Sequence, residues 1–192
     1  MYWRPIEIYI NSTPLTSVKA STHGDLSLVN FYSERVVRWD NGNVVMIDQT
    51  GLPLKLSYLR CTNHHEIVDA IRRMAVRGAP VIGVAAAMGL ALTAWHSETQ
   101  EKVSLLSELD EAGRDLGSAR PTAVNLKWAV QRVLNRAKQV SGDVGEVRKA
   151  VLEEALAMAD EDVATNQRIG RHGSALLEDG DVVLTHCKWL FS

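Results

Sequence analysis

The stretch Val36-Val-Arg-Trp-Asp-Asn-Gly-Asn-Val-Val-Met-Ile-Asp48 decides how the fold begins. Two runs rich in β-branched residues flank Asn41-Gly42, and both turn residues tolerate the positive φ of a tight type I′ turn. The stretch therefore predicts a β-hairpin. A further short strand is expected over Leu54 to Leu59.

Beyond the hairpin the hydrophobic pattern changes to a helical period. Asn63 can cap a helix with Glu66 three residues later, and the apolar stripe predicts that this helix ends at Arg77-Gly78. Pro80 suits the first turn of the next helix, because the missing N–H of proline has no helical partner there. Further helices are expected near residues 103–116, after Pro121, and over about 144–177.

The composition is that of a globular protein and excludes several classes. Of 192 residues, 46% are hydrophobic and 23% charged, which excludes wholesale disorder, and the net charge of -2 argues against a dedicated nucleic-acid partner. Two cysteines cannot form a disulfide framework and match no zinc signature, which favours a reducing setting and no metal. The apolar segment Ala79 to Trp95 is interpreted as a buried core helix, and no secretory signal is recognised, so we expect a cytoplasmic protein without a membrane partner.

A second structural region is expected near the end of the chain. The segment Asp179-Gly-Asp-Val-Val-Leu-Thr-His-Cys187 carries a short, continuous apolar run after a long helix, which is typical of a parallel strand buried on both faces. We therefore expect an α/β fold: a small domain of hairpin strands and helices, then the start of a Rossmann-like parallel-sheet domain that is cut off. The expected divisions are an extension over residues 1–35, the strand and helix domain over 36–141, a linking helix with the first strand over 142–187, and a tail over 188–192.

Two helix starts carry an arginine where an anion could bind. Arg77 and Gly78 precede Ala79-Pro80, and Arg120 precedes Pro121. Helix N-termini favour anions, and a guanidinium can grip phosphate with two hydrogen bonds. Ordinary helix capping explains the same residues, so spacing alone leaves both interpretations open.

Cys187 ends the predicted strand, where ligands bind in open α/β sheets. A neighbouring arginine could lower its pKa, although a buried cysteine can also be only a small apolar side chain. Elsewhere in the chain, the consecutive residues His64 and His65 are interpreted as a solvated pair, and Trp95 and Trp128 as core residues.

Five ordered motifs resemble the methylthioribose-1-phosphate isomerase family of methionine salvage, within the superfamily that includes the subunits of initiation factor 2B. The motifs are Arg38-Trp-Asp-Asn-Gly, Ile47-Asp-Gln-Thr-Gly-Leu-Pro53, Met74-Ala-Val-Arg-Gly-Ala-Pro-Val-Ile-Gly83, Ala119-Arg-Pro-Thr-Ala-Val-Asn-Leu126 and Leu184-Thr-His-Cys187.

The resemblance implies a homodimeric enzyme that converts 5-methylthioribose 1-phosphate to 5-methylthioribulose 1-phosphate without metal, nucleotide or other cofactor. By motif, Arg77, Gly78, Ala79 and Arg120 would bind the phosphorylated sugar, and Cys187 would be the catalytic cysteine. The alternatives are a ribose-1,5-bisphosphate isomerase and a regulatory-subunit-like binding protein related to initiation factor 2B.

The chain departs from the family pattern at both ends. Residues 1–35 do not resemble the family's start, and Lys188-Trp-Leu-Phe-Ser192 follows Cys187 where the family continues with a turn and most of the Rossmann-like domain. The family's catalytic aspartate belongs to that continuation. The resemblance therefore implies a truncated chain without activity of its own.

Overall fold

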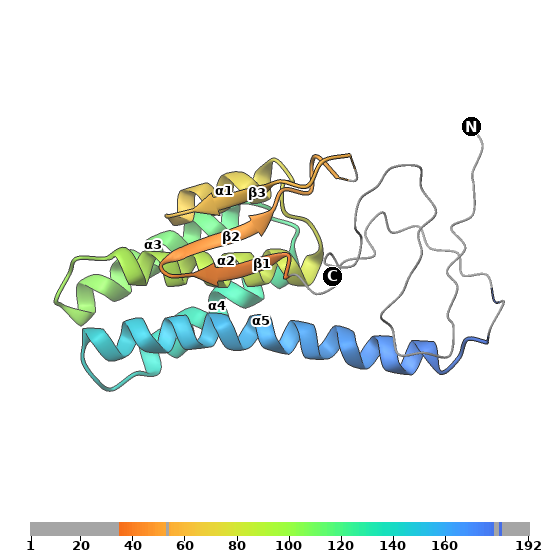
Figure 1. The fold of residues 1–192 in the computed structure, drawn as a ribbon. Helices are drawn as coiled ribbons and strands as arrows, with labels where there is room; N and C mark the ends of the chain where they lie inside the picture. Colours follow the sequence, from red (N-terminus) through yellow and green to blue (C-terminus); the bar gives the residue numbers. More distant parts are fainter. Residues whose placement is uncertain (1–34, 53, 179–180, 182–192) are drawn as a thin grey trace. The chain divides into compact units, whose positions relative to one another are not determined.

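The hairpin predicted from Asn41-Gly42 forms the first part of a three-stranded antiparallel sheet (Figure 1). The computed structural model describes residues 35–52, 54–178 and 181 of the chain. The strands are β1 (Val37–Asp40), β2 (Asn43–Ile47) and β3 (Tyr58–Cys61), in the order β1-β2-β3. Asn41 and Gly42 have φ of 48° and 82°, as a type I′ turn requires, so the turn prediction is confirmed.

The third strand lies later in the chain than the expected Leu54 to Leu59. Lys55 N donates to Gly51 O at 2.9 Å, which closes a loop and leaves Leu54 94% exposed. Pairing resumes only where Asp48 N donates to Ser57 O, at 2.8 Å. The hydrophobic run suggested a strand, but the local turn keeps the first half of that run out of the ladder.

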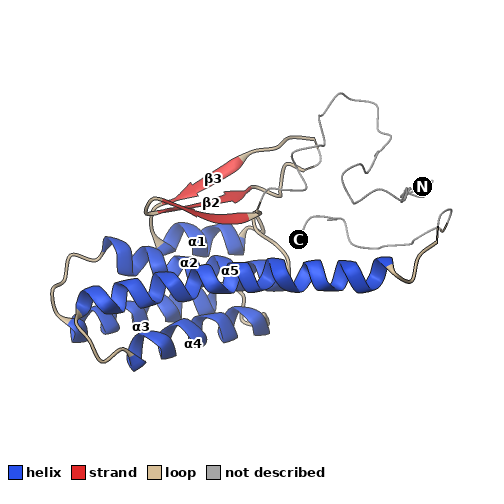
Figure 2. Ribbon diagram, turned by 60° about the horizontal axis from the view of Figure 1, so that its bottom comes forward, coloured by secondary structure: helices blue, strands red, loops and turns tan. Residues whose placement is uncertain are grey.

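Five helices follow within the described residues, and the second of them is the centre of the fold. They are α1 (His64–Arg72), α2 (Ala79–His96), α3 (Lys102–Ser118), α4 (Val124–Gln139) and α5 (Val144–Ser174). Helix α2 contacts α1, α3, α4 and the strands β1 and β2, and Figure 2 shows the sheet as a layer over the helices. It is long and apolar enough to cross a membrane, but 72% of that apolar window is buried inside the fold. These contacts support its interpretation as a core helix.

Glycines on α2 allow its neighbours to approach closely. A Cβ on Gly83 would lie 3.2 Å from the carbonyl oxygen of Asn125 on α4. A Cβ on Gly89 would lie 3.0 Å from a methyl group of Leu116 on α3. Larger side chains at these two positions would push α3 and α4 away from the central helix.

Helix α1 begins as predicted and ends earlier than predicted. The Asn63 side chain accepts from Glu66 N at 3.1 Å, which confirms the N-cap. The helix ends at Arg72 rather than at Arg77-Gly78, because Met74 adopts a left-handed φ of 58°. Ala75 N then donates back to Ala70 O at 2.9 Å, and Met74 N to Ile71 O at 3.2 Å. This is a Schellman motif, built without the glycine that normally signals it.

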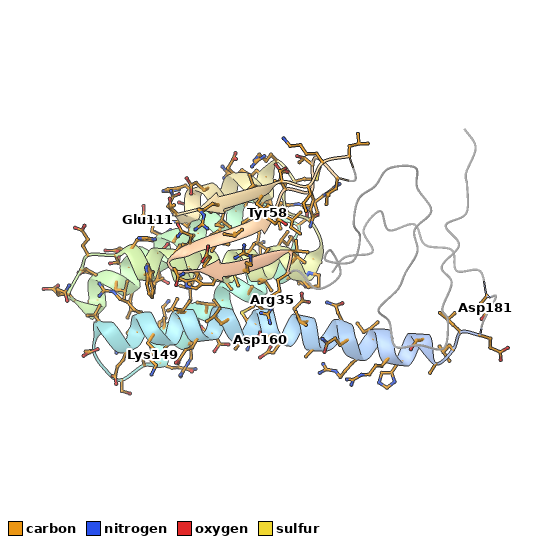
Figure 3. The ribbon with its side chains drawn as sticks, in the orientation of Figure 1. Arg35, Tyr58, Glu111, Lys149, Asp160 and Asp181 are labelled. Carbon is orange, nitrogen blue, oxygen red and sulfur yellow. The ribbon has the colours of Figure 1, made fainter. Side chains whose placement is uncertain are left out.

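The first part of α5 packs on the helices through small and apolar residues, and ion pairs add to this contact. Arg132 on α4 donates to Glu154 at 2.6 Å and to both oxygens of Glu161 at 2.6 and 2.7 Å. Arg35 and Asp160, which lie side by side in Figure 3, form another ion pair at 2.6 Å.

The chain divides into two units, and the division falls inside α5. Residues Arg35–Val163 form one compact unit with the sheet and the hydrophobic core. Residues from Ala164 onward belong to the second, in which α5 continues to Ser174. The Rossmann-like strand expected before Cys187 lies outside the described residues, and the domain boundaries expected from the sequence stay predictions.

Candidate active site

The start of α2 has the properties of an anion-binding helix terminus. Gly78 is its N-cap, with φ of 102° and ψ of 126°, a conformation that residues with a Cβ rarely adopt. A Cβ there would meet only Val81, with the nearest atom at 3.6 Å, so backbone geometry rather than space requires glycine. Gly78 and Ala79 are exposed, and no side chain among the described residues caps the helix. The first N–H groups and the positive end of the helix dipole are therefore open to an anion.

Arg77 is held beside this helix start by the loop that follows β2. Its Nη2 donates to the backbone oxygen of Gln49 at 3.3 Å, and Gln49 N donates to Ala75 O at 2.8 Å. Arg77 is half-buried, and the Nε atom of its guanidinium group is buried. The two backbone contacts of Gln49 position the guanidinium next to the exposed amides of α2.

Gln49 is a candidate site residue that sequence reasoning missed. Its side chain is only 5% exposed, and its Oε1 has no hydrogen-bond donor among the residues that the structure describes. Gln49 lies within the motif Ile47–Pro53 that supported the family resemblance. That motif was the available signal, but a contact between residues 28 positions apart leaves no trace in local spacing.

Asp48 stabilises the same loop. Its Oδ1 accepts from Thr50 Oγ1 at 2.6 Å and from Thr50 N at 3.0 Å, and Arg73 lies 3.7 Å from Oδ2. The hydrogen bond from the Thr50 hydroxyl lowers the pKa of Asp48, with the Thr50 amide and the Arg73 charge adding to the shift against the effect of burial. The ionised carboxylate thus fixes the loop that holds Arg77.

Arg120 is placed differently from the sequence expectation. It was expected directly before a helix start, but α4 begins only at Val124. Ala123 N donates to Arg120 O at 3.0 Å, so Arg120 and Pro121 begin a tight turn that precedes the helix. Proline fits the second position of such a turn because its φ is already set.

The structure brings the two arginine-bearing segments to the same end of the helix pair. Gly83, in the second turn of α2, packs against Asn125 and Ala129 in the first turns of α4. The loop with Arg77 and the turn with Arg120 therefore both lie at the N-terminal ends of α2 and α4. Both side chains are half-buried. Two guanidinium groups and a helix terminus at one end can bind a phosphate group.

The two cysteines differ in what the structure says of them. Cys187 lies outside the described residues, so its role stays a prediction. Cys61, at the end of β3, is a free and buried thiol. Burial, followed by the charge of Glu66, raises its pKa to about 11, so it is protonated at neutral pH. Cys61 is thus a core residue, and the described part of the site offers binding groups rather than a reactive thiol.

Comparisons with known proteins show which family the chain belongs to. The model of the initiation factor 2 subunit family matches residues 75–189, which include the Arg77 loop, the Arg120 turn and Cys187. The chain belongs to the initiation factor 2 subunit family.

Similar members of the family are named as sugar-phosphate isomerases. A 5-deoxyribose 1-phosphate isomerase from Moorella thermoacetica is 47% identical over 152 residues, which cover 79% of this chain and 43% of the relative. A methylthioribose-1-phosphate isomerase from Desulforamulus reducens is 41% identical over 150 residues, with coverage of 78% and 43%.

Two solved structures of the family share the fold. The 5-methylthioribose 1-phosphate isomerase of Pyrococcus horikoshii superposes with a TM-score of 0.74 at 38% identity, covering 76% of this chain and 41% of that one. A structure titled translation initiation factor eIF-2B, subunit delta, from A. fulgidus has a TM-score of 0.72 at 45% identity, with coverage of 77% and 43%. The chain thus spans less than half the length of the curated relatives it matches.

Proposed function

We propose that this chain forms the phosphate-binding part of an aldose–ketose isomerase that converts 5-methylthioribose 1-phosphate to 5-methylthioribulose 1-phosphate in methionine salvage. The observation that supports this most directly is the Arg77–Gly78 helix start, anchored by Gln49 and at the same end of α2 and α4 as Arg120. Relatives and a structural neighbour with this activity in their names support the same assignment.

The chemistry of the substrate explains why tight phosphate binding matters. The phosphate group sits on the anomeric oxygen, so the sugar ring cannot open spontaneously as it does in free aldoses. The enzyme must assist ring opening and then move hydrogen between C2 and C1. Arg77, Gly78, Ala79 and Arg120 hold the phosphate in this proposal, and Cys187 is the catalytic residue. No metal or nucleotide cofactor is part of the scheme.

The substituent at C5 is the open part of the substrate assignment. The relative from Moorella thermoacetica is named for 5-deoxyribose 1-phosphate, which has the same phosphorylated ring end and lacks the methylthio group. The site described above contacts the phosphate end, so it suits both sugars. A ribose 1,5-bisphosphate substrate would require a second set of cationic groups at C5.

A binding protein related to initiation factor 2B is the second candidate. The A. fulgidus structure with that title, at 45% identity, is the observation that favours it. A non-catalytic subunit has no need of a helix start with an exposed glycine N-cap and an anchored arginine. Sugar-phosphate binding is therefore expected of the isomerase and not of the binding protein, so a binding measurement distinguishes the two functions. For the isomerase we also propose a cytoplasmic homodimer without nucleic-acid or membrane partners.

A chimera tests the isomerase directly. Residues 36–187 of this chain would replace the matching part of the Moorella thermoacetica relative, and the purified chimera would be assayed with both 5-methylthioribose 1-phosphate and 5-deoxyribose 1-phosphate. The proposal expects turnover of at least one of them. A folded chimera without turnover, or one active only on ribose 1,5-bisphosphate, would contradict it.

Variants of the same chimera test whether Arg77 binds the phosphate group. Arg77→Ala should raise KM by about tenfold or more, since a charged hydrogen bond contributes roughly 1.5–3 kcal/mol. Arg77→Lys should recover only part of the loss, because lysine lacks the planar fork. Arg114→Ala, at an exposed position on α3, is the matched control. Equal KM values for the Arg77 and Arg114 variants would remove Arg77 from the site.

A further inference from the structure

Two histidines and an aspartate meet at the far end of α2 from the proposed phosphate site. His64 and His65 are the first residues of α1, and Asp115 lies near the end of α3. His64 Nε2 is 3.4 Å from Asp115 Oδ2, and His65 Nδ1 is 3.8 Å from the same oxygen. The sequence suggested a solvated histidine pair, but the His64 side chain is only 16% exposed and the two rings lie 3.9 Å apart between centroids.

The hydrogen bonds of Thr93 fit a His64 tautomer that suits metal binding. Thr93 Oγ1, on α2, donates to the carbonyl oxygen of Gly89 at 3.2 Å, the usual back-bond of a helical threonine. The same Oγ1 lies 3.2 Å from His64 Nδ1. When the hydroxyl proton is donated to Gly89 O, Oγ1 accepts a hydrogen bond from His64 Nδ1–H. His64 Nε2 then carries a lone pair.

That lone pair faces another acceptor. In this tautomer His64 Nε2 and Asp115 Oδ2, 3.4 Å apart, both offer a lone pair, and a cation between them would bind both; in the other tautomer the same two atoms form an Nε2–H···Oδ2 hydrogen bond. Zinc–nitrogen and zinc–oxygen bonds of about 2.0–2.2 Å at a tetrahedral angle give a separation of roughly 3.4 Å between two ligand atoms. The observed separation of 3.4 Å thus matches that of two ligands on one tetrahedral ion.

The remaining features of the cluster fit the same ion. The ligand atoms of the three side chains all lie within 4.8 Å of one another. His65 is 72% exposed, so its ring can rotate to complete the set, and a water molecule can take the fourth position. Glu111, labelled in Figure 3, lies one turn before Asp115 on α3. Its negative charge interacts with His64 and offsets the positive end of the α1 dipole.

We propose that His64, His65 and Asp115 bind a zinc ion, with Thr93 as the residue that orients His64. Imidazole and carboxylate ligands suit Zn²⁺, and a second hydrogen bond on the ligating histidine is the usual support of such a site. Thr93 lies 15 residues beyond Gly78, about 22 Å along the α2 axis at 1.5 Å per residue. The ion would therefore link α1 to α3 and take no part in phosphate binding, so this proposal and the isomerase proposal fail independently.

Binding of ZnCl₂ to the full chain, made without a histidine tag and stripped with a chelator, tests the site by calorimetry and by the shift in Tm. We expect one Zn²⁺ per chain and a higher Tm, because a ligand of the folded state stabilises it. His65→Gln and Asp115→Asn should abolish most of the Tm shift. The matched controls are His172→Gln and Asp110→Asn, which change a histidine and an α3 carboxylate outside the cluster.

Two further measurements separate this site from other sources of zinc affinity. The absorption spectrum of the Co²⁺-loaded chain should be that of a tetrahedral ion without a thiolate charge-transfer band. The Cys187→Ser variant should give the same spectrum. Thr93→Val should weaken zinc binding by about 10- to 100-fold, as changes to such supporting residues typically do. Zinc binding that survives both His65→Gln and Asp115→Asn, a thiolate band lost in Cys187→Ser, or no zinc binding at neutral pH would each overturn the proposal.

Discussion

Gly78→Ala isolates the backbone requirement at the start of α2. The φ of 102° lies where residues with a Cβ are strained, and holding alanine there costs roughly 1–3 kcal/mol. No clash adds to this figure, since the new Cβ would make ordinary contact with Val81 at 3.6 Å. We therefore expect Gly78→Ala to lower the free energy of unfolding by roughly 1–3 kcal/mol through strain alone.

Urea denaturation followed by circular dichroism measures this change as a shift in midpoint at constant slope. Gly117→Ala is the matched control, because Gly117 is in helix α3 and a Cβ there would meet no atom within 4 Å. Alanine is the better helix former, so this control should be unchanged or more stable by up to about 1 kcal/mol. If Gly78→Ala unfolds at the same urea concentration as the parent chain, the strain argument is wrong, and glycine is not required at that position.

Three other measurements test the core, the α5 contact and the loop that anchors Arg77. Arg132→Met should cost roughly 1–2 kcal/mol in urea denaturation, since it removes partly exposed charged hydrogen bonds to Glu154 and Glu161; an unchanged midpoint would show that apolar packing alone holds α5. Iodoacetamide should label Cys61 at least about a hundredfold more slowly than a free thiol, because the pKa of Cys61 rises from 9.0 to about 11. Peptide mass spectrometry measures the labelling rates, and comparable rates would contradict a buried environment for this thiol. The lowered pKa of Asp48 implies stabilisation that is full above pH 3.8 and is lost as the pH falls through the folded pKa. Asp48→Asn should therefore be less stable than the parent chain at neutral pH, and the difference in stability should shrink below pH 3.8. A difference that does not depend on pH would refute this reasoning.

Features that depend on neighbouring residues were predictable from the sequence. The Asn41-Gly42 turn needs two adjacent residues with positive φ, and the Asn63 cap needs a hydrogen bond to an amide three residues away. Pro80 in the first turn of α2 is equally local. Each of these signals lies within four residues, so the sequence contains all the information that the structure uses there.

Features that depend on residues distant in the sequence were not predictable from it. Met74 takes a left-handed φ that its residue type does not suggest, and it ends α1 five residues before the expected end at Arg77. Trp95 and Trp128 were expected in the core but are 52% and 54% exposed. Trp95 instead packs edge-on against Trp39, with centroids 5.7 Å apart, beside the turn. These placements follow from how the sheet and helices pack, which a hydrophobic period does not encode.

The proposed phosphate site combines both kinds of information. Its helix start is local, because Gly78 and Pro80 can be recognised from sequence alone. Its anchor is not, because Gln49 reaches the Arg77 segment through tertiary backbone contacts. Arg77 and Arg120 both belong to the compact unit Arg35–Val163, whereas Cys187 lies outside the described residues. In the proposed function Arg77 contributes phosphate affinity and Cys187 the acid–base step, so substitutions at Arg77 should change KM and substitutions at Cys187 should change kcat.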